Sequence, residues 1–123
     1  MQKTPIIAIV DDDEATREAL KLLLRAWGRN ASTFSSAEDF LHSANVRDTS
    51  CLITDVHMPG LSGLDLQDRI IADGLRIPVV IMTGYLDDNV RVRAMKARAI
   101  CVLEKPFNSR ELLRCIEQAL QEA

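Results

Sequence analysis

Residues 51–60 read CLITDVHMPG, a short apolar run that breaks into a polar loop at Asp55. Three other apolar runs end in the same way. They are Ile6–Val10 before Asp11-Asp12-Asp13, Val79–Met82 before Thr83-Gly84, and Ile100–Leu103, which leads to Lys105-Pro106. In a parallel sheet the carboxyl ends of the strands share one edge, where open α/β folds bind ligands. We therefore expect these polar groups to meet at one edge of a sheet.

Strand-length apolar runs alternate with helical periodicity five times along the 123 residues. The predicted strands are Pro5–Val10, Asn30–Phe34, Cys51–Thr54, Pro78–Met82 and Ala99–Leu103. Most are apolar throughout, which is typical of strands buried on both faces, whereas the polar Asn30–Phe34 fits an edge position. Five βα units with short connections predict a doubly wound α/β fold, (βα)5, with a five-stranded parallel sheet in the order 2-1-3-4-5.

The segments between the strands have the apolar spacing of helices. One stripe comprises Leu20, Leu23, Leu24 and Trp27, and another comprises Leu112, Cys115, Ile116, Ala119 and Leu120. Capping-box spacing joins Ser35 to Glu38 and Asn108 to Glu111, and Asp87-Asp88-Asn89 offers a cap for a helix that runs to about Ala97. We expect residues 1–123 to form a single domain that ends with its fifth helix, with any output domain absent.

The composition argues against several classes of protein. A net charge of −3 and a pI near 5.3 argue against a nucleic-acid-binding face. No apolar stretch is long enough to span a membrane, and Met1–Pro5 lead into a strand without a signal-peptide pattern. The cysteines Cys51, Cys101 and Cys115 lack metal-site or redox spacing, so we expect reduced, buried thiols in a cytoplasmic protein.

Adjacent carboxylates at the expected sheet edge repel each other unless a cation lies between them. Mg²⁺ prefers oxygen ligands, and Asp12, Asp55 and a backbone carbonyl just after Asp55 would make such a site. Asp55 is then the candidate nucleophile, since a carboxylate can attack phosphorus and form an aspartyl phosphate. Mg²⁺, Lys105 and the Thr83 hydroxyl would each stabilise one phosphoryl oxygen. The alternative is that the acid run only caps the following helix and complements its dipole.

With these motifs in this order and spacing, the chain resembles a response regulator receiver domain from its first strand to its last helix. The matching stretches are VDDD (10–13), TDVHMPGLSG (54–63), MTG (82–84) and EKPF (104–107), and RAMKA (93–97) is most similar to the FixJ subgroup. The resemblance implies a flavodoxin-like receiver fold with Asp55 as the phosphoacceptor and a histidine kinase as the phosphodonor. It also implies Mg²⁺ held by Asp11, Asp12, Asp55 and the His57 backbone carbonyl, with Thr83 and Lys105 contacting the phosphoryl group.

Two positions depart from the family pattern. Val102 stands where the family usually has an aromatic switch residue, and Arg98 replaces a usual glycine. Tyr85 would either supply an aromatic ring near Thr83 or be a plain loop tyrosine. His57 would either modulate the lifetime of the phosphoryl group, by shielding it or orienting water, or be an exposed loop histidine.

We expect a phosphorylation-controlled signalling module that modifies only itself, rather than an enzyme. Its fourth helix and fifth strand would present a surface to a second copy or to an output domain, which in a longer protein would bind DNA and control transcription. The basic residues Arg91, Arg93, Lys96 and Arg98 would either dock a partner there or form a solvated helix face. The alternative is a degenerate receiver that binds proteins without being phosphorylated. A phosphohydrolase would need a carboxylate at His57, and a flavin carrier a phosphate loop in place of the three aspartates.

Overall fold

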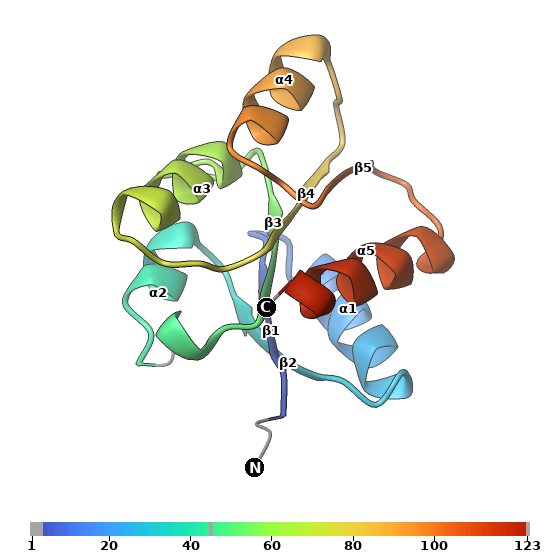
Figure 1. The fold of residues 1–123 in the computed structure, drawn as a ribbon. Coiled ribbons are helices and arrows are strands. Elements are labelled where there is room, and N and C mark those ends of the chain that lie inside the picture. Colours follow the sequence, from blue (N-terminus) through green and yellow to red (C-terminus); the bar gives the residue numbers. More distant parts are fainter. Residues whose placement is uncertain (1–3, 45, 123) are drawn as a thin grey trace.

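The computed structural model describes residues 4–44 and 46–122 (Figure 1). Residues 1–3, part of the segment predicted to lack a signal-peptide pattern, lie outside the described residues. The described strands are β1 (Ile6–Val10), β2 (Asn30–Phe34), β3 (Cys51–Asp55), β4 (Val79–Thr83) and β5 (Cys101–Glu104). The α-helices are α1 (Glu14–Ala26), α2 (Ala37–Leu41), α3 (Gly63–Ala72), α4 (Asp88–Lys96) and α5 (Ser109–Glu122), and a 3₁₀ turn, η1, spans Val46–Asp48.

The five strands form one parallel sheet in the order β2-β1-β3-β4-β5, which confirms the predicted fold class and strand order. Helices α1 and α5 cover one face of the sheet, and α2, α3 and α4 cover the other (Figure 1). Strands β1 and β3 lie side by side, and later strands are added on the side of β3 while β2 lies on the other side of β1. The carboxyl ends of all five strands therefore face the same edge, as the parallel pairing requires.

Alternate residues of the inner strands supply two separate cores. Ala8 and Val10 of β1 pack with α2, α3 and α4, whereas Ile7 and Ile9 pack with α1 and α5. Strands β3 and β4 are buried at every position, as their unbroken apolar runs predict. The polar strand β2 is half exposed and pairs with β1 alone, which confirms its predicted edge position.

The helix caps agree with the sequence patterns at two of three places. The Asp87 side chain caps α4 by accepting from the Val90 amide at 2.9 Å, and Asn108 accepts from the Glu111 amide at 2.8 Å. The predicted capping box of Ser35 and Glu38 is wrong, because Ser36 is the residue that caps α2. The Glu38 carboxylate instead turns toward the loop after β3.

The prediction that all three cysteines are free thiols is correct only for Cys51. Cys51 is fully buried in β3, and burial raises the pKa of its thiol to about 12. Cys101 of β5 and Cys115 of α5 form a disulfide, with their Cα atoms 6.0 Å apart. The inner face of α5 packs directly against β5, and this packing brings two distant positions within the span of a disulfide.

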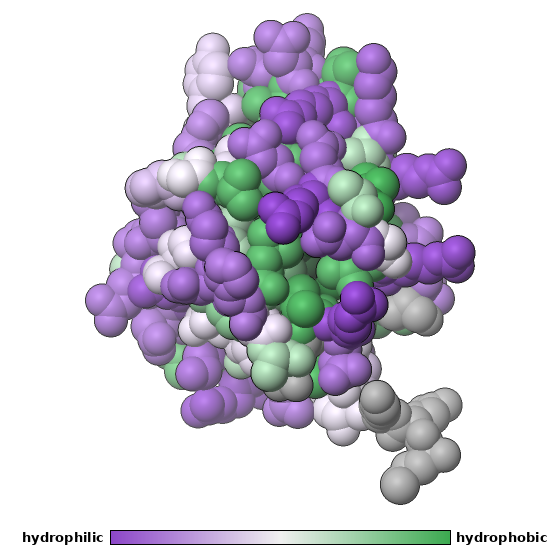
Figure 2. Space-filling model, turned by 90° about the vertical axis from the view of Figure 1, so that its left-hand side faces the viewer, coloured by the Kyte–Doolittle hydropathy of each residue, from purple (hydrophilic) through white to green (hydrophobic). Residues whose placement is uncertain are grey.

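The face that carries α2 and α3 is hydrophilic around its margin, and hydrophobic side chains show mainly in its middle (Figure 2). The large apolar side chains that stay exposed are Leu22, Ile71, Tyr85, Val92 and Met95. Among the described residues, no helix combines the length and apolar character that a membrane crossing requires.

Candidate functional site

The polar ends of four strands meet at one edge of the sheet. Asp11 follows β1, Asp55 ends β3, Thr83 ends β4 and Lys105 follows β5. Carboxylate oxygens of Asp11, Asp12 and Asp55 all lie within 4.8 Å of one another. Because hard divalent cations prefer oxygen ligands, this donor set fits a metal ion of that kind.

Lys105 joins two of these carboxylates. Its Nζ donates a hydrogen bond to Asp11 Oδ2 at 3.0 Å and lies 3.5 Å from Asp55 Oδ1. Burial alone would lower the pKa of Lys105, but the hydrogen bond to Asp11 and the charge of Asp55 outweigh it and raise that pKa. The ammonium is thus held charged beside Asp55. The Lys105–Pro106 peptide is cis.

Asp11 is fixed from several sides. Its side chain is 1% exposed, and its second oxygen, Oδ1, accepts from the Asp13 amide at 2.9 Å. Its backbone amide donates to Phe34 of β2, and its carbonyl accepts from the Arg17 guanidinium. Asp12 is exposed, so the two neighbouring aspartates differ in freedom. Asp11 orients Lys105, whereas Asp12 offers a carboxylate that solvent can reach.

The surroundings of Asp55 disfavour the charged form of its carboxyl group. Its burial raises its pKa, the Asp11 charge raises it further, and Lys105 partly opposes both effects. Burial and a like charge disfavour the carboxylate form, and a bound cation would relieve both costs. A bound divalent cation and a charged Asp55 would therefore stabilise each other.

The backbone behind Asp55 is closely packed. The Thr54 hydroxyl donates to the Asp55 carbonyl at 3.0 Å, and the Gly63 amide donates to the Val56 carbonyl at 2.9 Å. A Cβ at Gly63 would overlap the Asp55 carbonyl oxygen. The start of α3 can approach Asp55 this closely only because position 63 has no side chain.

Glu38 braces the loop that follows β3 from the side of α2. Its Oε2 accepts from the Leu61 amide at 3.3 Å, and it lies where a Cβ of Gly60 would be. Gly60 has a φ of +79°, a conformation that favours glycine. Glu38, Thr54 and Gly63 act on the position of Asp55, although none of them was predicted as a site residue. Thr54 and Gly63 carried a signal as the first and last residues of the TDVHMPGLSG motif, whereas Glu38 carried none.

Thr83 is buried at the edge, but its hydroxyl is engaged with the backbone of Tyr85. It donates to the Tyr85 carbonyl at 3.0 Å and accepts from the Tyr85 amide at 3.1 Å. The Tyr85 side chain is 68% exposed, and His57 is exposed as well. The structure thus gathers Asp11, Asp12, Asp55 and Lys105, with the side chains of His57 and Tyr85 in solvent.

Val102 stands on β5 at the position where the family usually has an aromatic residue. Val102 is half-buried on β5 and packs against the core beneath α2, α3 and α4. The next residue but one, Glu104, accepts from the Leu86 amide at 3.2 Å and so ties β5 to the loop that follows Thr83. The loop after Thr83 therefore contacts β5 through the Glu104 carboxylate.

The basic residues of α4 are not all free. Arg93 donates from one nitrogen to Asp65 and to Asp68, each at 2.8 Å, and so joins α4 to α3. Arg98 follows the helix with a φ of 65°. This is the left-handed region that glycine tolerates best, which is why glycine is the usual residue there. Arg93 therefore makes a partly exposed ion-pair contact between α4 and α3.

Comparison with known proteins agrees with this arrangement. The chain matches the response regulator receiver domain family over residues 7–117. The response regulator protein TodT of Pseudomonas putida is 42% identical over 119 residues, covering 97% of this chain and 52% of the relative. The transcriptional regulatory protein FixJ of Bradyrhizobium diazoefficiens is 39% identical over 117 residues, covering 95% of this chain and 57% of the relative.

The crystal structure of FixJ-N superposes with a TM-score of 0.88 at 34% identity, covering 100% of this chain and 98% of that one. The chain spans about half the length of the curated relatives that it matches. The residues 7–117 that match the family include all of the strands except Ile6 of β1, together with the whole aspartate cluster. The chain therefore belongs to the response regulator receiver domain family of two-component signalling.

Proposed function

We propose that this chain accepts a phosphoryl group from a histidine kinase on Asp55, in a reaction that depends on Mg²⁺. The observation that carries the proposal is the meeting of Asp55 with one ammonium and two further carboxylates. The Lys105 Nζ is 3.5 Å from the Asp55 carboxylate, and Asp11 and Asp12 complete a cluster within 4.8 Å. A nucleophile, a fixed cation and a set of oxygen ligands are the parts that phosphoryl transfer needs.

In the proposed reaction, an Asp55 carboxylate oxygen attacks phosphorus in line. The new P–O bond forms as the bond from phosphorus to the kinase histidine nitrogen breaks, and that nitrogen keeps the electron pair. The Lys105 ammonium leaves the carboxylates of Asp11 and Asp55 and donates to one phosphoryl oxygen. The Thr83 hydroxyl leaves the Tyr85 backbone and donates to a second phosphoryl oxygen. Mg²⁺, held by Asp11, Asp12, Asp55 and the His57 carbonyl, would supply positive charge that stabilises the phosphoryl oxygens.

The output is a changed surface. Release of the Thr83 hydroxyl from Tyr85 would rearrange the loop that leads into α4. Val92 and Met95 on α4 are each 51% exposed and give this helix an apolar contact area for a second copy or an output domain. The name of FixJ, a transcriptional regulatory protein, suggests that a protein containing this domain would regulate transcription. The phosphodonor kinase would act in the cytoplasm, with no direct contact between this segment and nucleic acid.

The chain serves as its own phosphoacceptor and acts on no separate substrate. The alternative, a receiver that binds partners without phosphorylation, draws on one observation. Val102 supplies no aromatic ring to follow Thr83, so the usual form of the switch is missing.

Intact-mass spectrometry tests the proposal directly. After incubation with acetyl phosphate, the wild-type chain should gain roughly 80 Da, the mass of one phosphoryl group on a carboxylate. The adduct should require Mg²⁺ and should be absent from Asp55→Asn.

Asp13→Asn is the matched control, because it removes a carboxylate at the same edge while asparagine keeps the cap of α1. This variant should be phosphorylated like the wild type. Labelling that persists in Asp55→Asn would refute the assignment of the acceptor. If neither acetyl phosphate nor a phosphorylated kinase domain modifies the wild type, the phosphorylation-independent module becomes the better description.

A further inference from the structure

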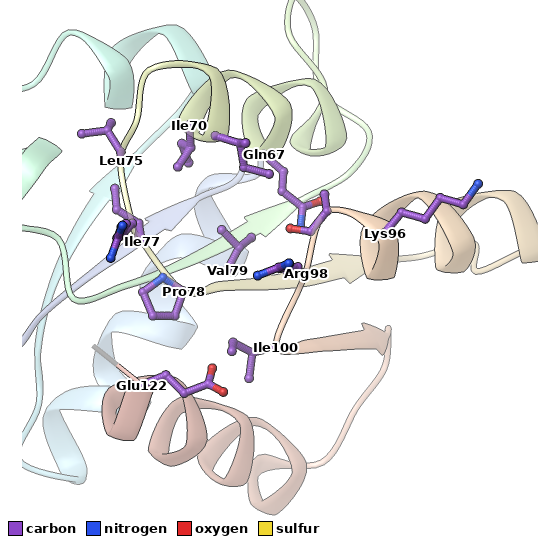
Figure 3. A pocket seen from close by; sticks show the side chains of 13 residues that line it. Gln67, Ile70, Leu75, Ile77, Pro78, Val79, Lys96, Arg98, Ile100 and Glu122 are labelled. Carbon is purple, nitrogen blue, oxygen red and sulfur yellow. The ribbon is translucent and has the colours of Figure 1, made fainter.

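A pocket of about 540 Å³ opens at the end of the sheet opposite the aspartate cluster, where β4 and β5 begin (Figure 3). Its walls come from the end of α3, the turn into β4, the turn after α4 and the end of α5. Sites for small molecules usually measure roughly 300–1,000 Å³, so the volume suits such a ligand. None of Asp11, Asp12, Asp55 or Lys105 lines this pocket, so it is separate from the phosphorylation site.

The floor of the pocket is apolar. Ile70 is 1% exposed, Val79 is 4% exposed and Ile77 is 8% exposed, and the half-buried Ile100 closes the side toward β5. Figure 3 shows these side chains around one space. An apolar ligand body would remove surface from water here, with a gain of roughly 25 cal/mol for each Å².

Gln67 provides a hydrogen-bond acceptor in the wall. Its side chain is buried, and Nε2 donates to the carbonyls of Ala94 and Ala97, each at 3.2 Å. These two bonds fix the amide orientation, because a flipped amide would place its oxygen against two carbonyl oxygens. Oε1 is buried and has no hydrogen-bond partner among the described residues. An unmet acceptor of this kind costs free energy, which a ligand N–H group would recover.

Two guanidinium groups lie at the mouth. The side chains of Arg76 and Arg98 are exposed lining residues, and within residues 4–44 and 46–122 neither makes a hydrogen bond or an ion pair. Figure 3 shows Arg98 over Val79, whereas Lys96 extends away along α4. Glu122 is the one carboxylate among the described lining residues, so Arg76, Arg98 and the more distant Lys96 outnumber it. Guanidinium groups pair with carboxylates in a planar, two-bond geometry.

We propose that this pocket binds a small organic anion, a carboxylate on a short apolar body that also carries an N–H donor. The apolar body lies against Ile70, Ile77 and Val79. The carboxylate pairs with Arg98 and Arg76, and the N–H group donates to Gln67 Oε1.

A titration of the ¹⁵N-labelled chain with N-acetyl-leucine, followed by ¹H–¹⁵N NMR, tests the site. This probe has a carboxylate, an N–H group and a branched apolar body. We expect saturable shift changes at Leu75, Val79 and Ile100. N-acetyl-leucinamide lacks the charge and 4-methylpentanoate lacks the N–H group, so each should bind at least about tenfold more weakly. The absence of saturable shifts, or equal binding of the uncharged amide, would overturn the proposal.

The variant Arg98→Gly removes the guanidinium from the pocket without disturbing the backbone, so it tests the contact between Arg98 and the ligand alone. Glycine accepts the φ of 65° at this position, so the variant should fold while binding N-acetyl-leucine about tenfold more weakly. Arg25→Gln, which removes an exposed arginine at the end of α1, is the control and should bind like the wild type. Glu122→Gln should tighten binding, because it removes the opposing carboxylate. Unchanged affinity in Arg98→Gly would show that the guanidinium does not hold the ligand.

Discussion

Gly63 links the backbone of α3 to the position of Asp55. Substitution by alanine would place a methyl group against the Asp55 carbonyl oxygen, a backbone atom that cannot turn aside. We expect Gly63→Ala to lower the free energy of unfolding by roughly 1–3 kcal/mol, the usual cost of overpacking. Urea unfolding followed by circular dichroism measures this difference.

Gly84 offers a matched control at the same edge of the sheet. A Cβ there would have no neighbour within 4 Å, and its φ lies outside the left-handed region. Gly84→Ala should therefore change the unfolding free energy by no more than about 0.5 kcal/mol. Equal effects of the two substitutions would contradict the close approach of α3 to Asp55.

At the scale of elements, Arg93 holds α4 against α3 through Asp65 and Asp68. The Arg93 side chain is 45% exposed, so solvent screens the pair and its contribution should be only about 0.2–1 kcal/mol. Arg93→Gln should cause a loss in this range and should increase hydrogen exchange in α4. Arg91→Gln, on the same helix, should cause neither change, and identical exchange in the two variants would refute the link.

The contact between α4 and α3 should also depend on pH. The hydrogen bond from Arg93 holds the pKa of Asp65 below its ordinary value of 3.8. A lowered pKa in the folded state contributes stability that is present above the unfolded-state pKa and is lost as the pH falls through the folded-state value. The difference between wild type and Arg93→Gln should therefore be constant near neutral pH and shrink as the pH falls below the ordinary pKa of 3.8.

The disulfide between Cys101 of β5 and Cys115 of α5 predicts how many thiols react with an alkylating reagent. Without reductant the native chain should show no thiol that reacts with an alkylating reagent, because Cys51 is fully buried and its pKa is about 12. Unfolding without reductant should expose one thiol, and unfolding with reductant three. Mass spectrometry after alkylation counts them, and three thiols without reductant would contradict the disulfide.

For the molecule as a whole, the aspartate cluster predicts stabilisation by Mg²⁺. A cation that binds only the folded state at one hundred times its Kd adds about 2.7 kcal/mol to the unfolding free energy. The melting temperature should rise with MgCl₂ but not with NaCl at equal ionic strength. Asp12→Asn should lose most of this rise, because Asp12 is an exposed member of the cluster and its loss leaves the core intact.

Asp13→Asn serves as the control for the Mg²⁺ measurement. Asp13 is adjacent to the cluster but caps α1, so its variant should keep the full response. An equal rise with NaCl, or a full rise in Asp12→Asn, would show that the cluster does not bind the cation.

Much of this molecule is predictable from its sequence. Buried parallel strands are apolar along their whole length, so the apolar runs in the sequence mark where the strands lie. The alternation of these strands with helices predicts their order in the sheet. The carboxyl ends of the strands then place Asp11, Asp55 and Lys105 close together. The bounds of β5 differ from the prediction for a local reason. The Ala99 amide donates to the Ala94 carbonyl of α4, so Ala99 still belongs to the turn after this helix, and the strand begins at Cys101.

The rest depends on tertiary contacts that no local pattern contains. Glu38 has the spacing of a capping residue, but a loop 23 residues away offers its carboxylate a backbone amide. The disulfide of Cys101 and Cys115 requires the distance between a strand and the helix packed on it. Sequence spacing gives the face on which a residue lies, but it does not give the partner opposite that face.

The hydrogen bond between Lys105 and Asp11 spans 94 residues. A ribosome delivers the chain from its amino terminus, so β1 and its aspartates leave the exit tunnel well before Lys105 is translated. Until β5 takes its place at the sheet margin, Asp11 and Asp55 face each other without an ammonium between them. A nascent or prematurely terminated chain that stops before β5 would therefore carry an unbalanced acid cluster. The proposed phosphorylation of Asp55 would become possible only after Lys105, which follows β5, has joined the fold.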